Sequence, residues 1–397
     1  MRILFSSIFF IICTFIIVSC QGKPDKMNTA LIIPESYGVD TIHIDLDTIL
    51  TDLSFKDFFS KIEVIPLQTT KESSVHYCQK IIVNEGSINN YVLLDAQQIL
   101  LFSFDSIGNF IRKLPLNIRN SPYEFPHLWL YERGDRLIYN AFDSLYMYYY
   151  NGKISMYNNK TLEYIKKRKI NLDKFFLSAF FPLNNDIYVF QGVLGKEQND
   201  WGDTICFYSN SGDSLIKGQN IHQKFYSTLQ QSFPFEAFNN RVFFKSPIFS
   251  NAVYVIDSDS LTVTPFLVVD YGRRTLTESN FDSFYKDVTS QNRKSKNYAY
   301  LIDMKQNNKT YWFFSFLDGN IYISIYNKAA KAIQTLSIDF DFSVSLLTDE
   351  MLYCVIDANQ VQKIINSGIL TEENVLRLAK VKPSDNPLIL KCYLKVS

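Results

Sequence analysis

The chain has 397 residues, of which 47% are hydrophobic and 15% are aromatic, a content that excludes an intrinsically disordered protein. Its 40 lysines and arginines balance 40 aspartates and glutamates, and a neutral total gives no support for nucleic-acid binding. The length suits one large β domain or two ordinary domains.

The N-terminus is predicted to be an export signal with a lipid attachment site. Ile3–Val18 is almost wholly apolar, but it is too short and too close to the terminus to favour a permanent membrane span. It ends in Ile17–Cys20 (IVSC), which resembles a bacterial lipobox, so residues 1–19 are predicted to be a signal peptide and Cys20 the lipidated residue. The alternative is an ordinary signal peptide with a chance cysteine.

A lipid on Cys20 would anchor the protein to a membrane without a transmembrane helix, because each buried methylene contributes about 0.8 kcal/mol. Gln21 stands where an Asp would resemble an inner-membrane retention signal, which favours the outer membrane. Whether the protein faces the periplasm or the outside stays open. Residues 20–40 are predicted to be the lipidated N-terminus and a flexible tether, and residues 41–397 a single domain.

The domain begins with less regular elements and then a well-defined repeat. Residues 40–46 alternate like a strand, Leu53–Ser60 fits a short helix, and Lys61–Leu67 predicts a strand. Lys80–Leu114 then contains four runs rich in Val, Ile, Leu and Phe, separated by Asn, Asp and Gly, which is the pattern of an antiparallel meander. One such sheet repeated around an axis is a blade of a β-propeller.

Similar sets of strand-like runs follow along the chain. Asn151-Gly152 and Asp318-Gly319 stand between such runs and are strong hairpin signals. Short helical insertions are predicted near 277–290, from apolar residues at helical spacing, and near 357–381, where Thr371 precedes a helical run. The sets after the first occupy residues 135–170, 176–217, 235–269 and 298–338, and a less regular sixth set includes the strand Met351–Ile356.

Six sets with leftover strands at both ends predict an all-β fold, a six-bladed β-propeller of four-stranded antiparallel blades. Such a ring closes when a strand from one terminus pairs into the blade built from the other. Lys61–Leu67 and Leu388–Val396 are the candidates for this closure. A pair of two-sheet sandwiches is the alternative.

Over most of its mature length the sequence resembles the six-bladed β-propeller lipoproteins of Bacteroidetes, which are NHL-like propellers. The clearest parts are Lys61–Thr70, Ile81–Leu114 and Asn386–Lys395. In that family a segment close to Gly-x-Gly-Pro-Gly-Glu-Phe often follows the first blade, and here Arg119–Phe125 (RNSPYEF) keeps the Pro, Glu and Phe but lacks the glycines. The resemblance implies a fold and a location, and it supplies no common chemistry.

Recognisable catalytic and metal-binding motifs are absent: the sequence contains no GxSxG, HExxH, Walker A, GxGxxG or calcium-loop pattern, so neither a cofactor nor a metal site is predicted. Acid pairs such as Asp257/Asp259 and Asp339/Asp341 could serve glycoside hydrolysis, although turns between strands are their ordinary place. A recurrent Asp-Ser/Thr-aliphatic triplet, as in Asp105–Ile107, resembles an O-glycosylation acceptor, but most copies are expected to be turns before a strand, and modification of one or two is a hypothesis. Most histidines are expected at the surface or in turns: His43, His76, His127 and His222.

Tryptophans and cysteines complete the candidates. Trp201 lies in a polar loop and is the aromatic proposed to stack on a ligand such as a sugar, whereas Trp129 and Trp312 lie in strand-like runs and are expected in the core. Four cysteines remain after processing, and their wide spacing is unlike a compact disulfide framework. We expect most of these to be buried and unpaired: Cys78, Cys206, Cys354 and Cys392.

These observations predict a binding protein of the cell envelope. We expect an outer-membrane-anchored lipoprotein whose propeller binds a ligand or a partner, such as a glycan or an envelope protein, without catalysis. Two alternatives stay open. One is a glycan-active hydrolase or lyase with acids at the propeller axis, and the other is an accessory subunit of an envelope nutrient-uptake complex.

Overall fold

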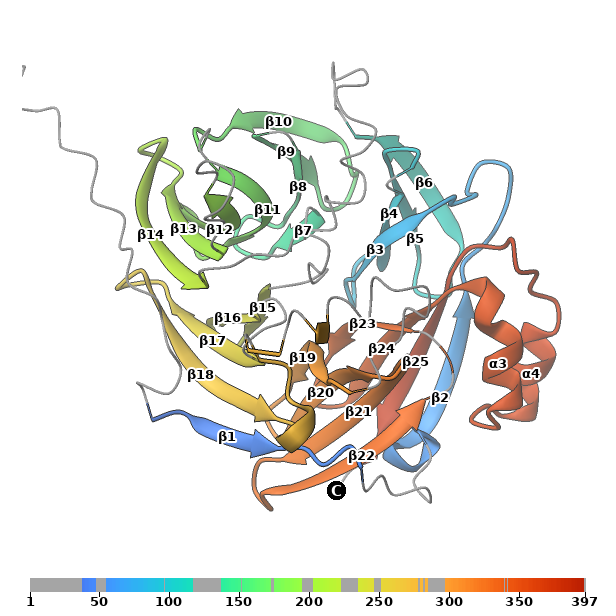
Figure 1. Cartoon of the computed structure of the whole chain (residues 1–397). Coiled ribbons are helices and arrows are strands. Elements are labelled where there is room, and N and C mark those ends of the chain that lie inside the picture. Colours follow the sequence, from blue (N-terminus) through green and yellow to red (C-terminus); the bar gives the residue numbers. More distant parts are fainter. Residues whose placement is uncertain are drawn as a thin grey trace, which may run out of the picture.

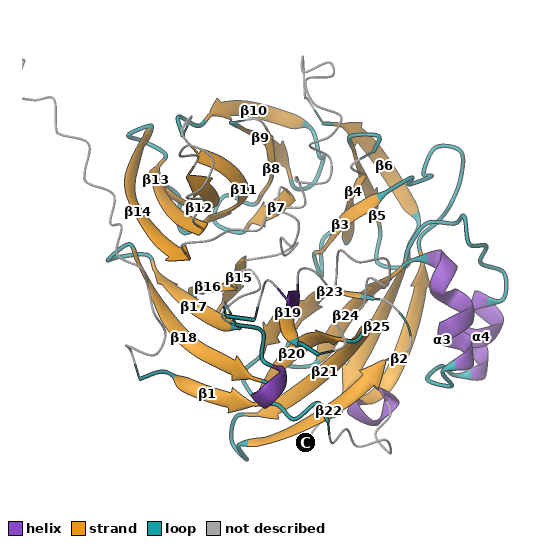
Figure 2. Ribbon diagram, in the orientation of Figure 1, coloured by secondary structure: helices purple, strands orange, loops and turns teal. Residues whose placement is uncertain are grey.

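The described part of the chain forms six sheets arranged around a central axis (Figure 1). This confirms the predicted all-β, six-bladed propeller of four-stranded antiparallel blades, and strands dominate the ribbon (Figure 2). The computed structural model describes residues 38–47, 55–95, 97–116, 137–150, 152–172, 175–194, 203–222, 235–245, 251–277, 279–280, 283–284, 297–338, 340 and 342–395.

The first five blades follow one another along the chain, each running from the axis outward. Blade 1 is β3 (Cys78–Val83), β4 (Tyr91–Asp95), β5 (Leu100–Phe104) and β6 (Phe110–Pro115). Blade 2 is β7 (Leu137–Asn140), β8 (Leu145–Tyr150), β9 (Lys153–Asn158) and β10 (Tyr164–Lys169). Blade 3 is β11 (Phe175–Pro182), β12 (Ile187–Leu194), β13 (Asp203–Ser209) and β14 (Ser214–His222). Blade 4 is β15 (Phe235–Phe238), β16 (Arg241–Lys245), β17 (Ala252–Asp257) and β18 (Thr262–Asp270). Blade 5 is β19 (Tyr300–Gln306), β20 (Thr310–Leu317), β21 (Asn320–Asn327) and β22 (Ala332–Ile338).

The sixth blade joins the two ends of the propeller. Its strands, from the axis outward, are β23 (Ser343–Leu347), β24 (Met351–Ile356), β25 (Leu388–Leu394) and β2 (Phe59–Pro66). β2 pairs antiparallel with β25, with Ile62 opposite Cys392. The predicted closure by Lys61–Leu67 and Leu388–Val396 is therefore confirmed.

Blade 4 carries an additional outer strand. The predicted strand at 40–46 is seen as β1 (Asp40–His43), and it pairs with β18 in parallel, with Ile42 beside Val269. The other neighbours within this sheet are antiparallel. The ring thus receives two strands from the N-terminal part of the chain, one in blade 4 and one in blade 6.

Positive-φ residues make the tightest turns. Asp318 and Gly319 have φ of 51° and 83° between β20 and β21, the two positive values that a type I′ hairpin turn requires. Gly108, with φ of 89°, lies so close to β2 that an added Cβ would stand 2.4 Å from the carbonyl oxygen of Pro66. Only glycine fits this contact between blade 1 and the closing strand.

Short helices lie at the side of blade 6 (Figure 1). The connection from β24 to β25 contains the 3₁₀ turn Ala358–Gln360 and the helices α3 (Val361–Asn366) and α4 (Glu372–Leu378), as predicted for 357–381. The side chain of Thr371 caps α4 by accepting from the backbone N–H of Asn374. Most of the other predicted insertion, 277–290, lies outside the described residues.

Two further 3₁₀ turns are Phe55–Phe58 (η2), inside the predicted helix at Leu53–Ser60, and Gly272–Arg274 (η5). None of the helices in the ranges given above is long and apolar enough to cross a membrane.

Helix α4 covers the outer edge of β2. The Asn374 side chain donates to the carbonyl of Ile62 at 2.8 Å, and Arg377 donates to the carbonyl of Val64 at 3.1 Å. An outermost strand otherwise presents unpaired backbone groups, which invite pairing with another chain. The helix therefore supplies hydrogen-bond donors to two backbone carbonyls on the outer edge of β2 that no further described strand pairs with.

The core lies between neighbouring blades rather than in one central mass, and clusters of buried side chains join each blade to the next. Trp312 is 2% exposed and packs against Phe59, which confirms the prediction that it belongs to the core. All four cysteines beyond the N-terminal region are free thiols, as expected, and three are buried: Cys206, Cys354 and Cys392.

Candidate binding site in the central channel

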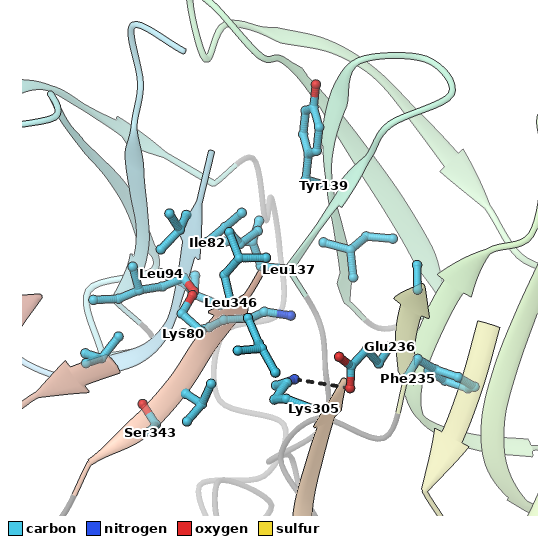
Figure 3. A pocket seen from close by; sticks show the side chains of 18 of the residues that line it. Lys80, Ile82, Leu94, Leu137, Tyr139, Phe235, Glu236, Lys305, Ser343 and Leu346 are labelled. Carbon is cyan, nitrogen blue, oxygen red and sulfur yellow. Dashed lines mark hydrogen bonds and ion pairs between the residues drawn. The ribbon is translucent and has the colours of Figure 1, made fainter. Parts of the chain in front are cut away.

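A cavity of about 610 Å³ occupies the axis of the propeller (Figure 3). The inner strands of all six blades contribute to its lining, and its volume falls within the usual range of small-molecule sites. Most of the wall is apolar. Representative lining residues are Ile82, Leu94, Leu137, Phe181, Phe235 and Leu346.

β-bulges set the direction of side chains on four of the inner strands. The register shifts in β3, β11, β19 and β23, so that the residue after each extra position is Lys80, Ala179, Asp303 or Leu346. A bulge adds one residue and re-aims the side chains that follow it. In β23 the extra residue, Ser345, donates its hydroxyl to the carbonyl of Ile81 at 2.7 Å, which ties the last blade to the first.

A cluster of four charged side chains lies beside the cavity, where blades 4 and 5 meet. Lys245 and Asp303 form a buried ion pair. Lys305 Nζ lies 3.5 Å from Asp303 Oδ2 and 3.8 Å from Glu236 Oε2. Their side chains are from 2% to 14% exposed, so these charges are held in a region of low dielectric.

Burial governs the titration of this cluster. Burial raises the pKa of Glu236, and the positive charge of Lys305 opposes this rise. Burial lowers the pKa of Lys245, and the negative charge of Asp303 opposes this fall. Glu236 Oε2 is buried and has no hydrogen-bond partner among the described residues. A buried acceptor oxygen without a hydrogen-bond partner is energetically costly, and this one has almost no surface that a water-sized molecule can reach.

Two more charged residues line the cavity from other blades. Lys80 on β3 points its amine into the cavity from blade 1 (Figure 3), and Asp357 follows β24 in blade 6. The lining therefore contains two basic residues, Lys80 and Lys305, and two acidic ones, Glu236 and Asp357. Lys245 and Asp303 add one charge of each sign behind the wall.

A smaller hollow of about 320 Å³ lies between blades 1 and 2. It is lined by the turn Asn84–Ile88 and by Asn159 and Lys160, and it shares Tyr139 with the central cavity. Ile88 at this site is 67% exposed. Tyr139 is thus the residue that borders both spaces.

Several of the site residues predicted from the sequence lie outside the part of the chain that the structure describes. Cys20, Trp129, Trp201, His127 and the segment Arg119–Phe125 lie outside the described residues, so lipid attachment and ring stacking stay predictions. The side chain of His222 is also not described.

The predicted surface and turn residues that are described behave as expected. His43 and His76 are exposed. Asp105 directly follows β5 and Asp257 ends β17, and the carboxylate of each accepts backbone N–H groups of the turn that follows, for example from Asn109 at 2.8 Å and Ser260 at 2.7 Å. Within the described ranges no group of three or more His, Cys, Asp or Glu side chains is placed to hold a metal ion.

The charged cluster itself was not predicted. Its members come from three strands, β15, β16 and β19, and no short motif contains them. One signal was present in the sequence: Glu236, Lys245 and Lys305 stand inside or at the end of apolar, strand-like runs, where a charge is unusual.

The fold and this site define a six-bladed propeller with a partly polar cavity at its axis. A family model described as a domain of unknown function (DUF4934) matches residues 40–393, and the chain belongs to this family. No curated protein matches the sequence.

Two solved structures are among those that match this chain. One is from Bacteroides fragilis and bears the description "Putative exported protein", with a TM-score of 0.66 and 14% identity over 90% of this chain and 100% of that chain. The other is U3-55K, with a TM-score of 0.40 and 10% identity over 74% of this chain and 78% of that chain. The first supports the propeller fold, and the second is too distant to carry an argument.

Proposed function

We propose that the protein is an exported, lipid-anchored propeller that binds a small ligand in its central channel without transforming it. The observation that carries the binding role is the cavity of about 610 Å³, with apolar walls and a few charged groups supplied by different blades. That combination is typical of ligand sites, in which apolar walls supply contact area and a few polar groups fix orientation.

Export and anchoring rest on other observations. The apolar stretch Ile3–Val18 and the lipobox-like Ile17–Cys20 favour a lipidated N-terminus, and the description of the B. fragilis relative favours an exported protein. Gln21 favours the outer membrane. The resemblance to Bacteroidetes lipoproteins agrees with this location.

The anchor is tested by expressing the full chain and Cys20→Ala in a bacterial host. We expect the unchanged chain in the membrane fraction, with an intact mass that matches removal of residues 1–19 and addition of lipid to Cys20. The variant should lose the lipid mass. An unmodified Cys20 in the exported protein would contradict lipidation.

The binding role is tested by purifying the full chain in detergent and examining it by native mass spectrometry. We expect a small molecule to be carried through purification by the unchanged chain and to be lost in Leu346→Trp, which places an indole in the cavity. Ile107→Trp is the matched control, since Ile107 is 71% exposed and does not line the cavity. Equal retention by both variants would exclude the channel as the site.

A glycan-active hydrolase is the second candidate, and one observation favours it. Glu236 is a carboxyl group near the axis whose pKa is raised by burial, as general acids of glycosidases require. Turnover of an oligosaccharide by the purified chain, abolished in Glu236→Gln, would establish the enzyme. Saturable binding without products supports the binding protein.

A further inference from the structure

The outer hairpin of blade 2 concentrates positive charge in a chain whose formal net charge is zero. Residues 153–169 form β9, β10 and the turn between them, and they contain six basic residues and one acidic residue, Glu163. Arg168 is half-buried on the face that packs against blade 3. The other five basic residues are exposed, at the outside of the ring (Figure 1), and we call them the basic rim: Lys153, Lys160, Lys166, Lys167 and Lys169.

The fold leaves these charges largely uncompensated. Lys153 and Lys169 stand directly opposite each other in β9 and β10, an arrangement in which like charges destabilise a sheet. Burial and the charge of Lys153 lower the pKa of Lys167. Lys153, Lys160, Lys166 and Lys169 form no ion pair with another described residue. A negatively charged partner would offset this repulsion.

Protection of the sheet edge explains only part of the basic rim. Lysine on an outermost strand hinders pairing with another chain, but Lys153 lies on β9, which is not outermost, and Lys160 lies in the turn. β10 also has a bulge between Tyr164 and Lys166, and a bulge hinders strand addition by itself. The bulge and the lysines together make an acidic peptide that adds as a further strand a poor fit.

A flat surface with many negative charges fits the basic rim better. Lys166 is on the face of β10 toward blade 3 and Lys167 on the opposite face, so a small anion in one groove meets only one of them. A membrane surface meets both faces of an outermost strand at once. At the start of β10, Tyr164 and Ile165 are 41% and 47% exposed, and tyrosine is enriched where proteins meet the membrane–water interface.

The predicted anchor brings a membrane within reach of this strand. The 20 residues that separate Cys20 from Asp40, where β1 begins, span at most about 70 Å when fully extended. A domain of this length measures about 50 Å across. Attachment of the lipid at Cys20 therefore permits blade 2 to face the membrane, although β1 belongs to blade 4.

We propose that the basic rim docks the propeller on the phosphate-bearing surface of the membrane that holds the Cys20 lipid. The inference rests on the proposed lipid anchor and adds an orientation to it. Docking through an outermost strand places the axis of the propeller roughly parallel to the membrane and keeps both ends of the channel clear of it. Each basic side chain near an anionic membrane strengthens binding about fivefold.

The test is the reactivity of lysines in the full lipidated chain after reconstitution into vesicles. One set of vesicles contains phosphatidylcholine alone, and the other adds anionic phosphatidylglycerol. Acetylation by a succinimidyl ester, quantified for each residue by mass spectrometry, reports which amines are accessible. We expect acetylation of Lys166 and Lys169 to fall about fivefold in the anionic vesicles and to recover at high salt. Lys309 and Lys331, exposed in blade 5 across the ring, should react equally in both.

Paired substitutions show whether charge causes the protection. Lys166→Gln with Lys169→Gln should restore acetylation of Lys160 in the anionic vesicles. Lys309→Gln with Lys331→Gln removes two exposed charges from blade 5 and should leave Lys160 protected. Thermal unfolding shows whether each variant is folded, and the measurement on the unchanged chain decides the question if one is not.

Flotation of the vesicles separates this inference from the proposed anchor. A chain that floats with both kinds of vesicle while its basic rim reacts equally in both overturns the docking and leaves the anchor standing. A chain that floats only with the anionic vesicles supports the basic rim and contradicts the anchor, and one that floats with neither overturns both. Protection by soluble polyglutamate but not by anionic vesicles would overturn the membrane as partner and assign the surface to an acidic protein.

Discussion

The two strands from the N-terminal part of the chain, β1 and β2, join the propeller in different ways. β2 completes blade 6, and its Ile62 and Val64 are 6% and 0% exposed within a core shared with blade 5 and the helices. β1 is added to blade 4, which already has four strands, and Ile42 is its one buried residue. The strand that completes a blade thus buries several of its own residues, whereas the added strand buries one, and the chain buries Ile44 and Leu46 only after the strand has ended.

Polar contacts at the end of β1 help to hold the added strand, in addition to the burial of Ile42, Ile44 and Leu46 against blades 4 and 5. Asp270 accepts at its backbone carbonyl from the N–H of Ile44 at 2.8 Å, and its carboxylate contacts the ring of His43 at 2.9 Å. Asp47 then binds both Arg273 and Arg274 beyond the end of β18. These groups are near the surface, where solvent and salt weaken ion pairs.

The largest effect is expected from Ile62→Ala in β2. Truncation of a buried isoleucine leaves a cavity and should lower the free energy of unfolding by about 2–5 kcal/mol. Urea denaturation followed by tryptophan fluorescence measures the loss. Ile42→Ala in β1 is the matched substitution, and we expect it to cost less because β1 has 4 residues against 8 in β2 and can therefore detach locally. Equal losses would show that both strands belong to one cooperative unit.

A somewhat smaller loss is expected from Asn386→Ala, just before β25. Its amide donates to the carbonyls of Gln68 and Ser73 at 2.9 and 2.7 Å and accepts from the N–H of Val75 at 2.9 Å. Removal of this 2% exposed side chain leaves buried backbone groups unpaired, so we expect a loss of about 2–3 kcal/mol. Asn366→Ala in α3 is exposed and should leave the unfolding midpoint unchanged.

The contact between α4 and β2 should contribute less to the free energy of unfolding than Asn386 does. Asn374→Ala removes the hydrogen bond to the carbonyl of Ile62, for an expected loss of about 1 kcal/mol. Hydrogen exchange should report faster exchange in β2 and α4 and little change in β1. Uniform acceleration throughout the ring would contradict a local role for this contact.

The smallest effect is expected from the loss of the Asp270 carboxylate charge, beside β1, as the pH falls. The hydroxyl of Thr275, the N–H of Gly272 and His43 lower the pKa of Asp270 below its usual value. A carboxyl with a lowered folded-state pKa stabilises the fold above its unfolded pKa of about 3.9, and that contribution is lost as pH falls through the folded value. Melting temperatures between pH 2.5 and 6 should therefore fall less steeply with acid in Asp270→Asn than in the unchanged chain. Parallel curves would exclude this contribution.

Sequence patterns predicted the blades well where alternation and turn residues agree. The hairpin at Asp318-Gly319 and the closure by Lys61–Leu67 both follow from local signals, an alternating strand and a turn that needs positive φ. β23 was not predicted, because it has only 5 residues, two of them serine, and a bulge between Val344 and Leu346 breaks its period of two. The parallel pairing of β1 with β18 has no local signal, since it depends on the position of a distant edge.

The candidate site was less predictable than the fold for a related reason. Glu236 and Lys305 lie on the inner strands of successive blades, and only the packing of blade 4 against blade 5 brings them together. Sequence reasoning instead favoured Trp201, because a loop aromatic is recognisable by itself. Charged residues within apolar runs would have been the better indicator, although no spacing rule identifies which of them meet.

The pairing of β2 with β25 also has a consequence for the order of folding. Tyr393 and Glu63, which are hydrogen-bonded across this pair, are 330 positions apart in the chain. Contacts between such distant residues form slowly, because most of the chain must be ordered before its ends can meet. Until β25 is made and delivered, β2 and β24 lack the partner strand that joins them, and exposed strand edges of this kind make folding intermediates prone to aggregation. We therefore expect ring closure to be the last and slowest step of folding, and the step at which a chaperone would protect the nascent protein.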